Sequence, residues 1–310
     1  MIYRTLGTTG LKLSHISFGG SSLGGVFHPI DEKRAEEAVY VAIENGINFI
    51  DVSPYYGYYR AETVLGRALK SIPRDQYYLS TKVGRYGANG VNTFDYSGKR
   101  AQTSVYESME RLGIDFIDII NVHDLEFSDL NQVVEETLPA LVELRDEGVV
   151  GFVGITGLPL INFKKVIDRV PPGTVNSILT FCHYTLQDQT LLDYLDYFEK
   201  HQVGIVNASP IAMGLLSERG TPDWHPASEK LKATCRKAAE FCHSKNIRIE
   251  QLAMRFSVGN PRITTTLTGT SNPDNIRMNI AWANGDLNEP MVAEVMEILQ
   301  PVMNETWENC

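Results

Sequence analysis

The chain has 310 residues, of which 43% are hydrophobic and 21% are charged, so it holds enough apolar residues for a sizeable core. This composition excludes the disordered, collagen-like and disulfide-scaffold classes of protein. Lysine and arginine number 28 against 38 acidic residues, which gives a formal net charge of −10. That charge would repel a nucleic-acid backbone or an anionic membrane surface, so we expect no nucleic acid and no membrane as partner.

The cysteines, the histidines and the N-terminal residues carry no metal or targeting signal. The four cysteines lie far apart, and neither a Cys-x-x-Cys pair nor a His-Glu-x-x-His motif occurs, so we expect no metal site. Residues 1–10 lack the basic segment, apolar run and cleavage site of a signal peptide. No stretch approaches the roughly 18 apolar residues of a membrane helix. We therefore expect a cytoplasmic protein.

The predicted elements begin with a hairpin and then alternate between strand and helix. Residues 2–6 and 11–13 flank a short loop bounded by two glycines, which predicts a β-hairpin. Apolar runs rich in β-branched and aromatic residues predict strands, and segments with a 3.6-residue apolar period predict helices. Strands are predicted at residues 15–20, 48–52, 77–83, 116–122, 151–155, 176–181, 204–207 and 263–267, and helices at 32–44, 62–69, 99–112, 130–147, 160–168, 191–200, 229–245, 249–258 and 273–283.

Eight strand–helix units favour a closed (β/α)8 TIM barrel over an open, doubly wound sheet. The strands are nearly continuous apolar runs, as expected of a parallel sheet that is covered on both faces. We expect the N-terminal β-hairpin to close the barrel bottom, and residues 1–310 to form a single domain because no linker divides them. The long segment 214–228 is interpreted either as a functional lid or as a surface excursion held down by Trp224.

Polar residues follow the predicted strands at the ends where a barrel carries its active site. They are Asp51, Lys82, His123, Thr156 and Ser209. One acid or lysine at a strand end is often only a structural ion pair, so the argument depends on their combination. An acid, a lysine and a histidine at successive strand ends point to proton transfer.

Tyr56 lies five residues beyond Asp51, in a loop that can return its phenol to the barrel mouth. A free phenol titrates near pH 10, too high for acid–base catalysis at neutral pH. We expect the ammonium of Lys82 to lower that pKa, Asp51 to pair with Lys82, and His123 to orient a substrate oxygen. These four groups can move a proton but cannot accept a hydride.

Other classes of active site leave no signature in the sequence. Residues 19–24, GGSSLG, have the glycines of a dinucleotide-binding loop without its spacing, and no Walker A loop occurs. The Gly-x-Ser-x-Gly elbow of serine hydrolases is also absent.

Three segments resemble the aldo-keto reductase family: residues 49–57 (FIDVSPYYG), 80–84 (STKVG) and 118–123 (DIINVH). Residues 206–216 are similar to the family's cofactor-binding segment after the seventh strand. The resemblance implies that Tyr56, Lys82, Asp51 and His123 are catalytic, and that a nicotinamide cofactor lies across the barrel mouth without a Rossmann domain. The cofactor-binding residues it implies are Thr156, Ser209, Pro210, Ile211, Met213, Gly214, Leu216, Gly269, Thr270, Ser271, Asn275 and Asn279.

The resemblance also bears on the choice between NAD and NADP. Family members that use NADP carry basic residues after the eighth strand to hold the 2′-phosphate, whereas this sequence aligns Gly269 and Asn275 there. Because those cations are missing on an acidic chain, NAD is the expected cofactor, although Arg277 lies nearby.

Longer strings, residues 154–160, 168–174, 182–184 and 223–228, resemble a sugar-oxidising branch of the family. The resemblance implies an NAD-dependent dehydrogenase that oxidises the anomeric carbon of an aldose, first of all L-galactose to its lactone on the route to ascorbate. The alternatives are oxidation of L-fucose or D-arabinose, an NADPH-dependent carbonyl reductase, and a cofactor-binding regulatory subunit. The candidate sugar-binding residues are Phe27, Arg85, Asp124 and Tyr184. We expect a monomer, with a dimer as the alternative.

Overall fold

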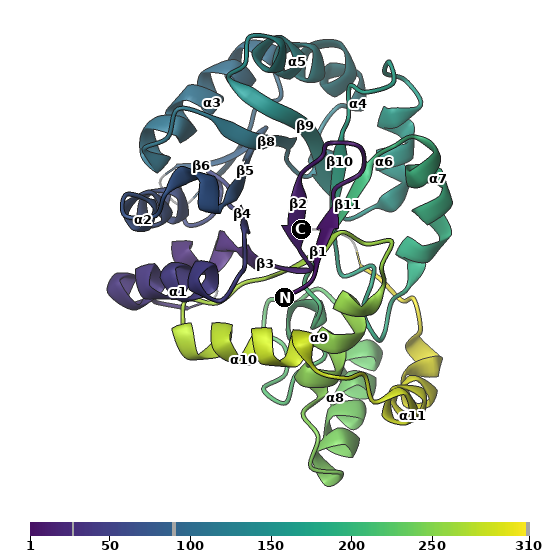
Figure 1. The fold of residues 1–310 in the computed structure, drawn as a ribbon. Coiled ribbons are helices and arrows are strands. Elements are labelled where there is room, and N and C mark those ends of the chain that lie inside the picture. Colours follow the sequence, from purple (N-terminus) through teal and green to yellow (C-terminus); the bar gives the residue numbers. More distant parts are fainter. Residues whose placement is uncertain (27, 89–90, 308–310) are drawn as a thin grey trace.

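In a computed structural model, which describes residues 1–26, 28–88 and 91–307, eight parallel strands close into a barrel (Figure 1). The barrel closes because the last strand pairs with the first, so that Thr266 lies opposite Ile16. The predicted barrel is confirmed, and the predicted strand bounds differ from the observed ones by at most two residues. The barrel strands are β3 (Ile16–Gly19), β4 (Phe49–Asp51), β5 (Tyr78–Val83), β8 (Ile117–Val122), β9 (Val150–Gly157), β10 (Ser177–Phe181), β11 (Gly204–Ala208) and β12 (Thr265–Thr268).

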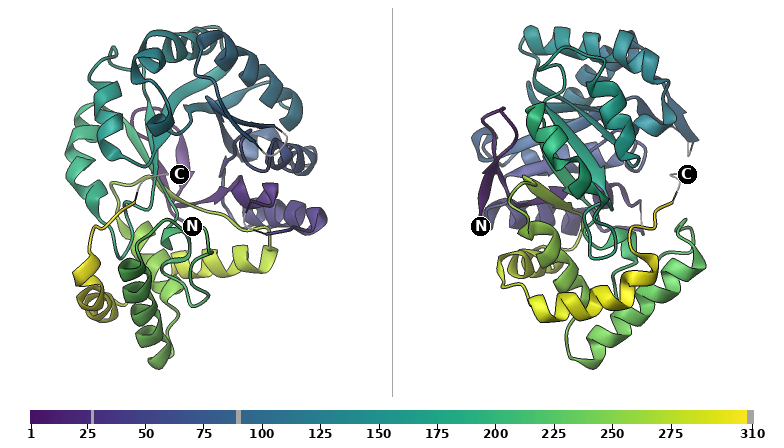
Figure 2. Two further views of the ribbon diagram at one scale, coloured as in Figure 1. Left: turned by 180° about the vertical axis from the view of Figure 1, so that it is seen from behind. Right: turned by 90° about the vertical axis from the view of Figure 1, so that its right-hand side faces the viewer.

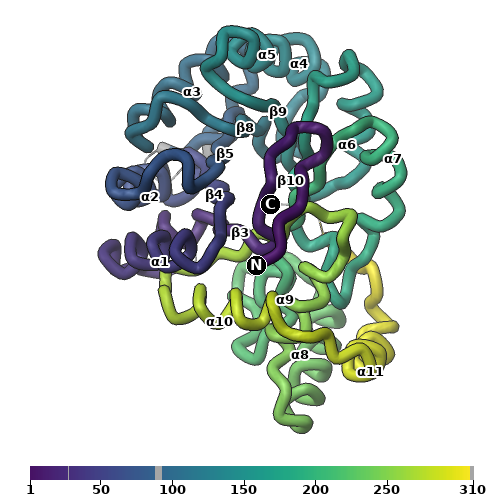
Figure 3. Tube along the Cα trace, viewed as in Figure 1, coloured from purple at the N-terminus to yellow at the C-terminus, as the bar shows by residue number. Residues whose placement is uncertain are grey.

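The N-terminal hairpin crosses the amino end of the barrel, as predicted (Figures 1 and 3). It consists of β1 (Tyr3–Thr5) and β2 (Lys12–Ser14), which pair antiparallel. Leu6 and Leu13 are fully buried and pack with the apolar side chains that fill the barrel interior. Gly7 has a φ of 49°, and a Cβ on this residue would lie 2.6 Å from the backbone nitrogen of Gly204. The hairpin therefore sits directly on the start of β11.

Helices surround the barrel, and most of them bury an apolar side. In the first of them Asp31 caps the helix by accepting hydrogen bonds from the backbone N–H groups of Lys33 and Arg34. The helices are α1 (Glu32–Glu44), α2 (Arg60–Leu69), α3 (Gly98–Leu112), α4 (Leu130–Gln132), α5 (Leu138–Asp146), α6 (Leu160–Ile167), α7 (Leu195–Lys200), α8 (Glu229–Ser244), α9 (Ile249–Gly259), α10 (Pro273–Asn284) and α11 (Glu289–Leu299).

Several elements differ from the prediction. The helix expected over 130–147 contains a π-helical turn, Val133–Thr137, between α4 and α5. A second hairpin, β6 (Arg85–Ala88) and β7 (Val91–Phe94), follows β5 and had no counterpart in the prediction. The same is true of α11, whose buried face packs in one apolar cluster with α8. Neither belongs to the strand–helix alternation on which the prediction was built.

The two ends of the described chain lie on opposite faces of the molecule. The hairpin occupies the amino end of the barrel, while the segment after α11 runs to the carboxyl end (Figure 2). There Asn304 donates its backbone N–H to the carbonyl of Gln187, and Trp307 lies 4.8 Å from the ring of His225. Within the described residues no helix is both long and apolar enough to cross a membrane.

Candidate active site

Three adjacent strands bring Asp51, Lys82 and His123 to the carboxyl mouth of the barrel. Asp51 ends β4, Lys82 lies near the end of β5, and His123 follows β8. Side chains alternate between the two faces of a strand, and these positions share the inward face with core residues such as Phe49 and Ile119. The sequence prediction that the strand ends converge is therefore confirmed.

Lys82 is held by a set of short contacts below the mouth. Its Nζ lies 2.6 Å from Oδ2 of Asp51 and donates to the carbonyl oxygen of Val52 at 2.8 Å. The other oxygen of Asp51 accepts a hydrogen bond from Ser80 at 2.5 Å. Lys82 is only 1% exposed, so this pairing compensates an ammonium that is removed from water.

The loop after β4 places Tyr56 beside Lys82 and His123. Nζ of Lys82 lies 4.8 Å from the centre of the Tyr56 ring, and the rings of Tyr56 and His123 lie 5.9 Å apart, close to perpendicular. The loop is fixed by two glycines: a Cβ on Gly24 would lie 2.6 Å from the backbone of Tyr56, and one on Gly57 would lie 2.1 Å from the oxygen of Gly24. The four predicted catalytic side chains thus form one cluster.

The electrostatics of this cluster correct one expectation. Burial raises the pKa of Tyr56 to about 12, more than the charge of Lys82 lowers it. Lys82 lowers the pKa of Tyr56 as predicted, but desolvation of the phenolate dominates, so the net pKa lies above its ordinary value. For Lys82, burial lowers the pKa, but Asp51 and Tyr56 outweigh it and the net pKa is raised. At neutral pH the site holds a phenol beside an ammonium.

His123 is neutral at physiological pH, because burial lowers its pKa to about 3. Its Nδ1 lies 3.1 Å from the hydroxyl of Ser53, and its backbone N–H donates to the carbonyl oxygen of Val83. Its Nε2 lies 3.5 Å from a carboxylate oxygen of Asp124. A neutral imidazole with one nitrogen engaged can hydrogen-bond a substrate oxygen through the other.

Of the predicted sugar-binding residues, Arg85 and Asp124 reach the cluster. Their side chains form a buried ion pair of 2.6 Å between Nη1 and Oδ2. The guanidinium of Arg85 lies 3.9 Å from the ring centre of Tyr55 and 4.7 Å from that of Phe127. The backbone N–H of Asp124 donates to the hydroxyl of Thr156, so this predicted cofactor residue also faces the site.

The prediction for Tyr184 is wrong. The chain turns outward after β10, and the ring of Tyr184 stacks on Phe256 of α9 at 5.1 Å. Its phenol is directed toward Asn260, whose carbonyl also binds Arg4 of the hairpin, at the amino end of the barrel. A residue three positions beyond the end of β10 could not be assigned to the mouth without knowing which way the loop turns. Phe27, the remaining candidate, lies outside the described residues.

The predicted cofactor-binding loop after β11 has an unusual backbone. Ser209, Ala212 and Met213 have φ values of 57°, 47° and 54°, in the left-handed region that costs side-chain-bearing residues energy. Such backbone strain is concentrated at binding sites in proteins. The remaining predicted members of this loop, Pro210, Ile211, Gly214 and Leu216, share the tight turn.

The other predicted cofactor residues lie between the end of β12 and α10. Asn275 donates to the hydroxyl of Thr270, and Asn279 donates to that of Thr268. A Cβ on Gly269 would lie 2.8 Å from the backbone oxygen of Gly19, so a larger residue would clash with the end of β3. These neutral hydroxyl and amide groups, together with the neighbouring Ser271, suit the hydroxyls of a ribose. The donor set therefore fits the ribose of a nicotinamide dinucleotide.

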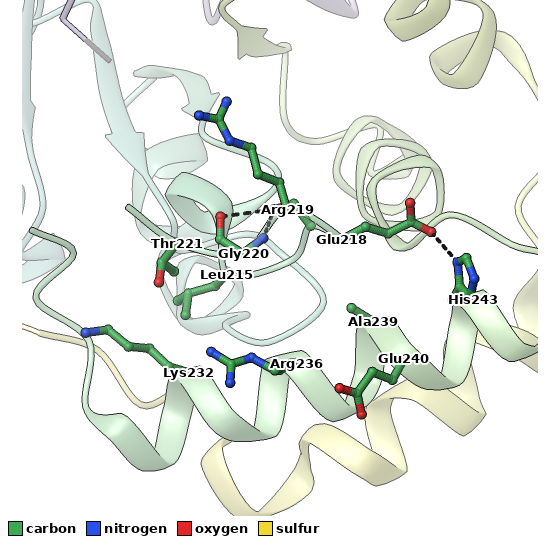
Figure 4. A pocket seen from close by; sticks show the side chains of 11 residues that line it. Leu215, Glu218, Arg219, Gly220, Thr221, Lys232, Arg236, Ala239, Glu240 and His243 are labelled. Atoms are coloured by element: carbon green, nitrogen blue, oxygen red, sulfur yellow. Dashed lines mark hydrogen bonds and ion pairs between the residues drawn. The ribbon is translucent and has the colours of Figure 1, made fainter. Parts of the chain in front are cut away.

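A cavity of about 500 Å³ lies between the end of this loop and α8, away from the tetrad of Tyr56, Lys82, Asp51 and His123 (Figure 4). It is lined by part of the long segment 214–228, including Arg219, and by Lys232 and Arg236 of α8. Trp224, which was expected to hold this segment down, is 54% exposed, and its ring stacks on that of His225 at 6.2 Å. The ring of His225 lies 3.3 Å from the carbonyl oxygen of Ala212.

A (β/α)8 barrel that brings a tyrosine together with a buried lysine, aspartate and histidine at its carboxyl mouth defines an oxidoreductase class that needs no Rossmann domain. The chain belongs to the aldo/keto reductase family, whose model matches residues 15–300. Among the residues that the structure describes, no group of three or more histidine, cysteine or acidic side chains is placed to hold a metal ion.

Individual relatives agree with this assignment. The chain is 47% identical to an L-galactose dehydrogenase of Arabidopsis thaliana, over 98% of this chain and 96% of that protein. It is 32% identical to a D-arabinose 1-dehydrogenase of Saccharomyces cerevisiae, over 80% and 76% of the two chains. Among solved structures, the holo form of an aldo-keto reductase from Bacillus halodurans superposes with a TM-score of 0.80 at 26% identity, covering 100% of this chain and 98% of the other.

Proposed function

We propose that this protein is an NAD-dependent aldose 1-dehydrogenase that oxidises the anomeric carbon of L-galactose to the lactone, as in ascorbate formation. The observation that carries the proposal is the partly buried Tyr56 ring that lies between Lys82 and His123. The substrate follows from the relative of 47% identity, which is named for L-galactose.

Each residue of the tetrad has its own role in the oxidation. A nicotinamide cofactor, when bound, supplies the hydride acceptor. Tyr56 acts as a base in its phenolate form, after its own proton has passed to solvent. The phenolate takes the proton of the anomeric hydroxyl while the carbon gives up its hydride, and the C–O bond becomes the lactone carbonyl. Lys82 stabilises the phenolate form of Tyr56, and Asp51 keeps Lys82 charged and in place. His123 hydrogen-bonds the reacting oxygen through Nε2.

The structure supports NAD over NADP through the partners of Arg277. Its guanidinium lies 3.2 Å from a carboxylate oxygen of Asp274, and Arg34 approaches the same side chain. The two cations near the predicted 2′ position, Arg277 and Arg34, are therefore both engaged by an acid that would itself repel a phosphate. Gly269 and Asn275 add no charge there.

The proposal is tested by initial rates at 340 nm with NAD⁺ and with NADP⁺, using L-galactose, L-fucose, D-arabinose and D-galactose. We expect NAD⁺-dependent oxidation with L-galactose preferred. A preference for D-arabinose or L-fucose would retain the chemistry and favour the activity that the yeast relative is named for. Folded protein that binds the dinucleotide without oxidising any sugar would refute the proposal in favour of a cofactor-binding regulatory role.

A further inference from the structure

The ion pair of Arg85 and Asp124 has no role in the proton transfer described above. Both side chains are buried, with 5% and 6% of their surface exposed, and burying two charges costs free energy that the pair only partly recovers. Replacement by apolar residues of similar size would be as stable or more stable in many proteins. A buried charge pair at the edge of an active site therefore points to a use in binding.

The geometry of the pair leaves one carboxylate oxygen available. Arginine and carboxylate commonly meet through two parallel hydrogen bonds. Here Arg85 and His123 both approach Oδ2 of Asp124, at 2.6 and 3.5 Å, and the described residues form no hydrogen bond to Oδ1. This oxygen is not fully buried either, so it keeps some contact with solvent.

The carboxylate is held rigidly in this position. Asp124 has a φ of 48°, and its backbone N–H is fixed by the hydroxyl of Thr156. The backbone carbonyl of Asp124 accepts a hydrogen bond from the phenol of Tyr96, which also binds the carbonyl of His123. Arg85 is itself enclosed by the rings of Tyr55 and Phe127. A preorganised acceptor of this kind loses little entropy when a donor binds it.

We infer that Oδ1 of Asp124 accepts a hydrogen bond from the substrate hydroxyl on the carbon next to the reacting carbon, and that Arg85 is the positioning residue that aims this carboxylate. The inference rests on the proposed function, because it takes the reacting oxygen to lie at Nε2 of His123. The adjacent hydroxyl of an aldose is one carbon away from that oxygen, and Asp124 is the carboxylate beside Nε2. The site thereby selects 2-hydroxylated aldoses over 2-deoxy sugars.

The test compares kcat/KM for L-galactose and 2-deoxy-L-galactose, with NAD⁺, in the wild type and in Asp124→Asn. A hydrogen bond to a charged acceptor is worth roughly 100-fold in discrimination, which is the ratio expected for the wild type. Asp124→Asn should lower kcat/KM for L-galactose by about that factor and leave the 2-deoxy sugar nearly unchanged. Equal loss on both sugars, or a wild type that does not discriminate, overturns the inference.

Two further variants separate binding from folding. The double variant Asp124→Asn/Arg85→Gln removes both charges and leaves no unpaired guanidinium, and it should lose the same discrimination. Asp118→Asn breaks a comparable contact, 2.5 Å from Arg74, at the start of β8 and away from the mouth. It should lower stability without changing the ratio between the two sugars. A wild type that oxidises no aldose refutes the proposed function and the inference with it, whereas oxidation without discrimination refutes the inference alone.

Discussion

At the scale of single residues, the chemistry depends on how burial and neighbouring charges oppose each other. Tyr56 and Lys82 are both removed from water, and burial penalises the phenolate of one and the ammonium of the other. Asp51 decides the outcome, because its carboxylate keeps Lys82 charged, and a charged Lys82 is the group that favours the phenolate. Tyr56 therefore keeps its proton at rest at neutral pH, and oxidation uses the phenolate form that the charge of Lys82 favours.

Replacing Tyr56 by Phe removes the proton acceptor and keeps the ring. We expect kcat for aldose oxidation to fall by about 10³-fold or more, which is the range for loss of a general acid–base group. Binding of NADH, followed by quenching of protein fluorescence, should persist because the phenol does not act on the dinucleotide. Tyr58→Phe, in the same loop with 42% of its surface exposed, is the matched control and should retain full activity. Retained turnover in Tyr56→Phe would exclude this residue as the acid–base group.

His123 makes stability depend on pH. Its pKa is about 3 in the folded protein and about 6.5 when unfolded, so the unfolded chain binds an extra proton between these values. The stabilisation from a neutral buried His123 is present above pH 6.5 and is lost as the pH falls toward 3. Between pH 7 and pH 5 we expect this residue alone to cost about 2 kcal/mol of unfolding free energy.

Urea unfolding at the two pH values measures that loss. His123→Gln keeps a polar side chain without a titrating group, and its decline in stability between pH 7 and pH 5 should be smaller by the same amount. Identical declines in the two proteins would show that His123 does not titrate differently on folding.

At the scale of elements, the sequence is sufficient to predict a strand and the place of its end residues wherever the apolar periodicity and the geometry of a barrel combine. Eight apolar runs gave the strands, and parallel strands must place their carboxyl ends at one mouth, which is why Asp51, Lys82 and His123 could be grouped in advance. The hairpin of β6 and β7 and the turn at Tyr184 could not be predicted, because neither carries a period and both depend on tertiary contacts. The net pKa of Tyr56 could not be predicted for a similar reason. The sequence shows that a charged lysine lies near the phenol but not how far both groups are desolvated.

The start of α10 is the element in which cofactor choice can be altered. Asp274→Ala with Asn275→Arg removes the acid that engages Arg277 and adds a second cation. We expect kcat/KM with NADP⁺ to rise by roughly 10- to 100-fold, since charge-assisted hydrogen bonds to a phosphate become available. Glu135→Lys changes the net charge by the same amount in the exposed turn between α4 and α5, and should leave cofactor preference unchanged. An unaltered NADP⁺ rate in the double variant would place the 2′ position elsewhere.

At the scale of the whole molecule, the hairpin closes the amino end of the barrel, and the candidate active site lies at the carboxyl end. The hairpin covers the amino end with Leu6 and Leu13, which are fully buried in the barrel interior, while the ionisable side chains gather at the carboxyl mouth. Stability and chemistry are thereby assigned to opposite faces of the same barrel, as is general for this architecture.

The contribution of the contact between the hairpin and β11 to stability can be measured with substitutions at two glycines. Gly10→Ala places a side chain at a φ of 80° with no atom within 4 Å, and should cost about 1 kcal/mol of unfolding free energy from backbone strain alone. Gly7→Ala has similar strain and also forces a Cβ to 2.6 Å from the backbone of Gly204, so we expect a loss larger by about 2 kcal/mol. Equal losses in urea unfolding would mean that the hairpin is not anchored on β11.

The opposite positions of the two ends of the described chain determine where a tag or a surface tether should be attached. Glu305 bonds Ser228 and Trp307 contacts His225, so the last described residues lie beside the loop that begins at Ser209. An affinity tag or fusion partner appended there would crowd the entrance for dinucleotide and sugar, whereas one joined before Met1 would extend from the plugged face. For immobilised assays or surface-coupled biosensors, tethering through the amino terminus presents the working face of the barrel to solution.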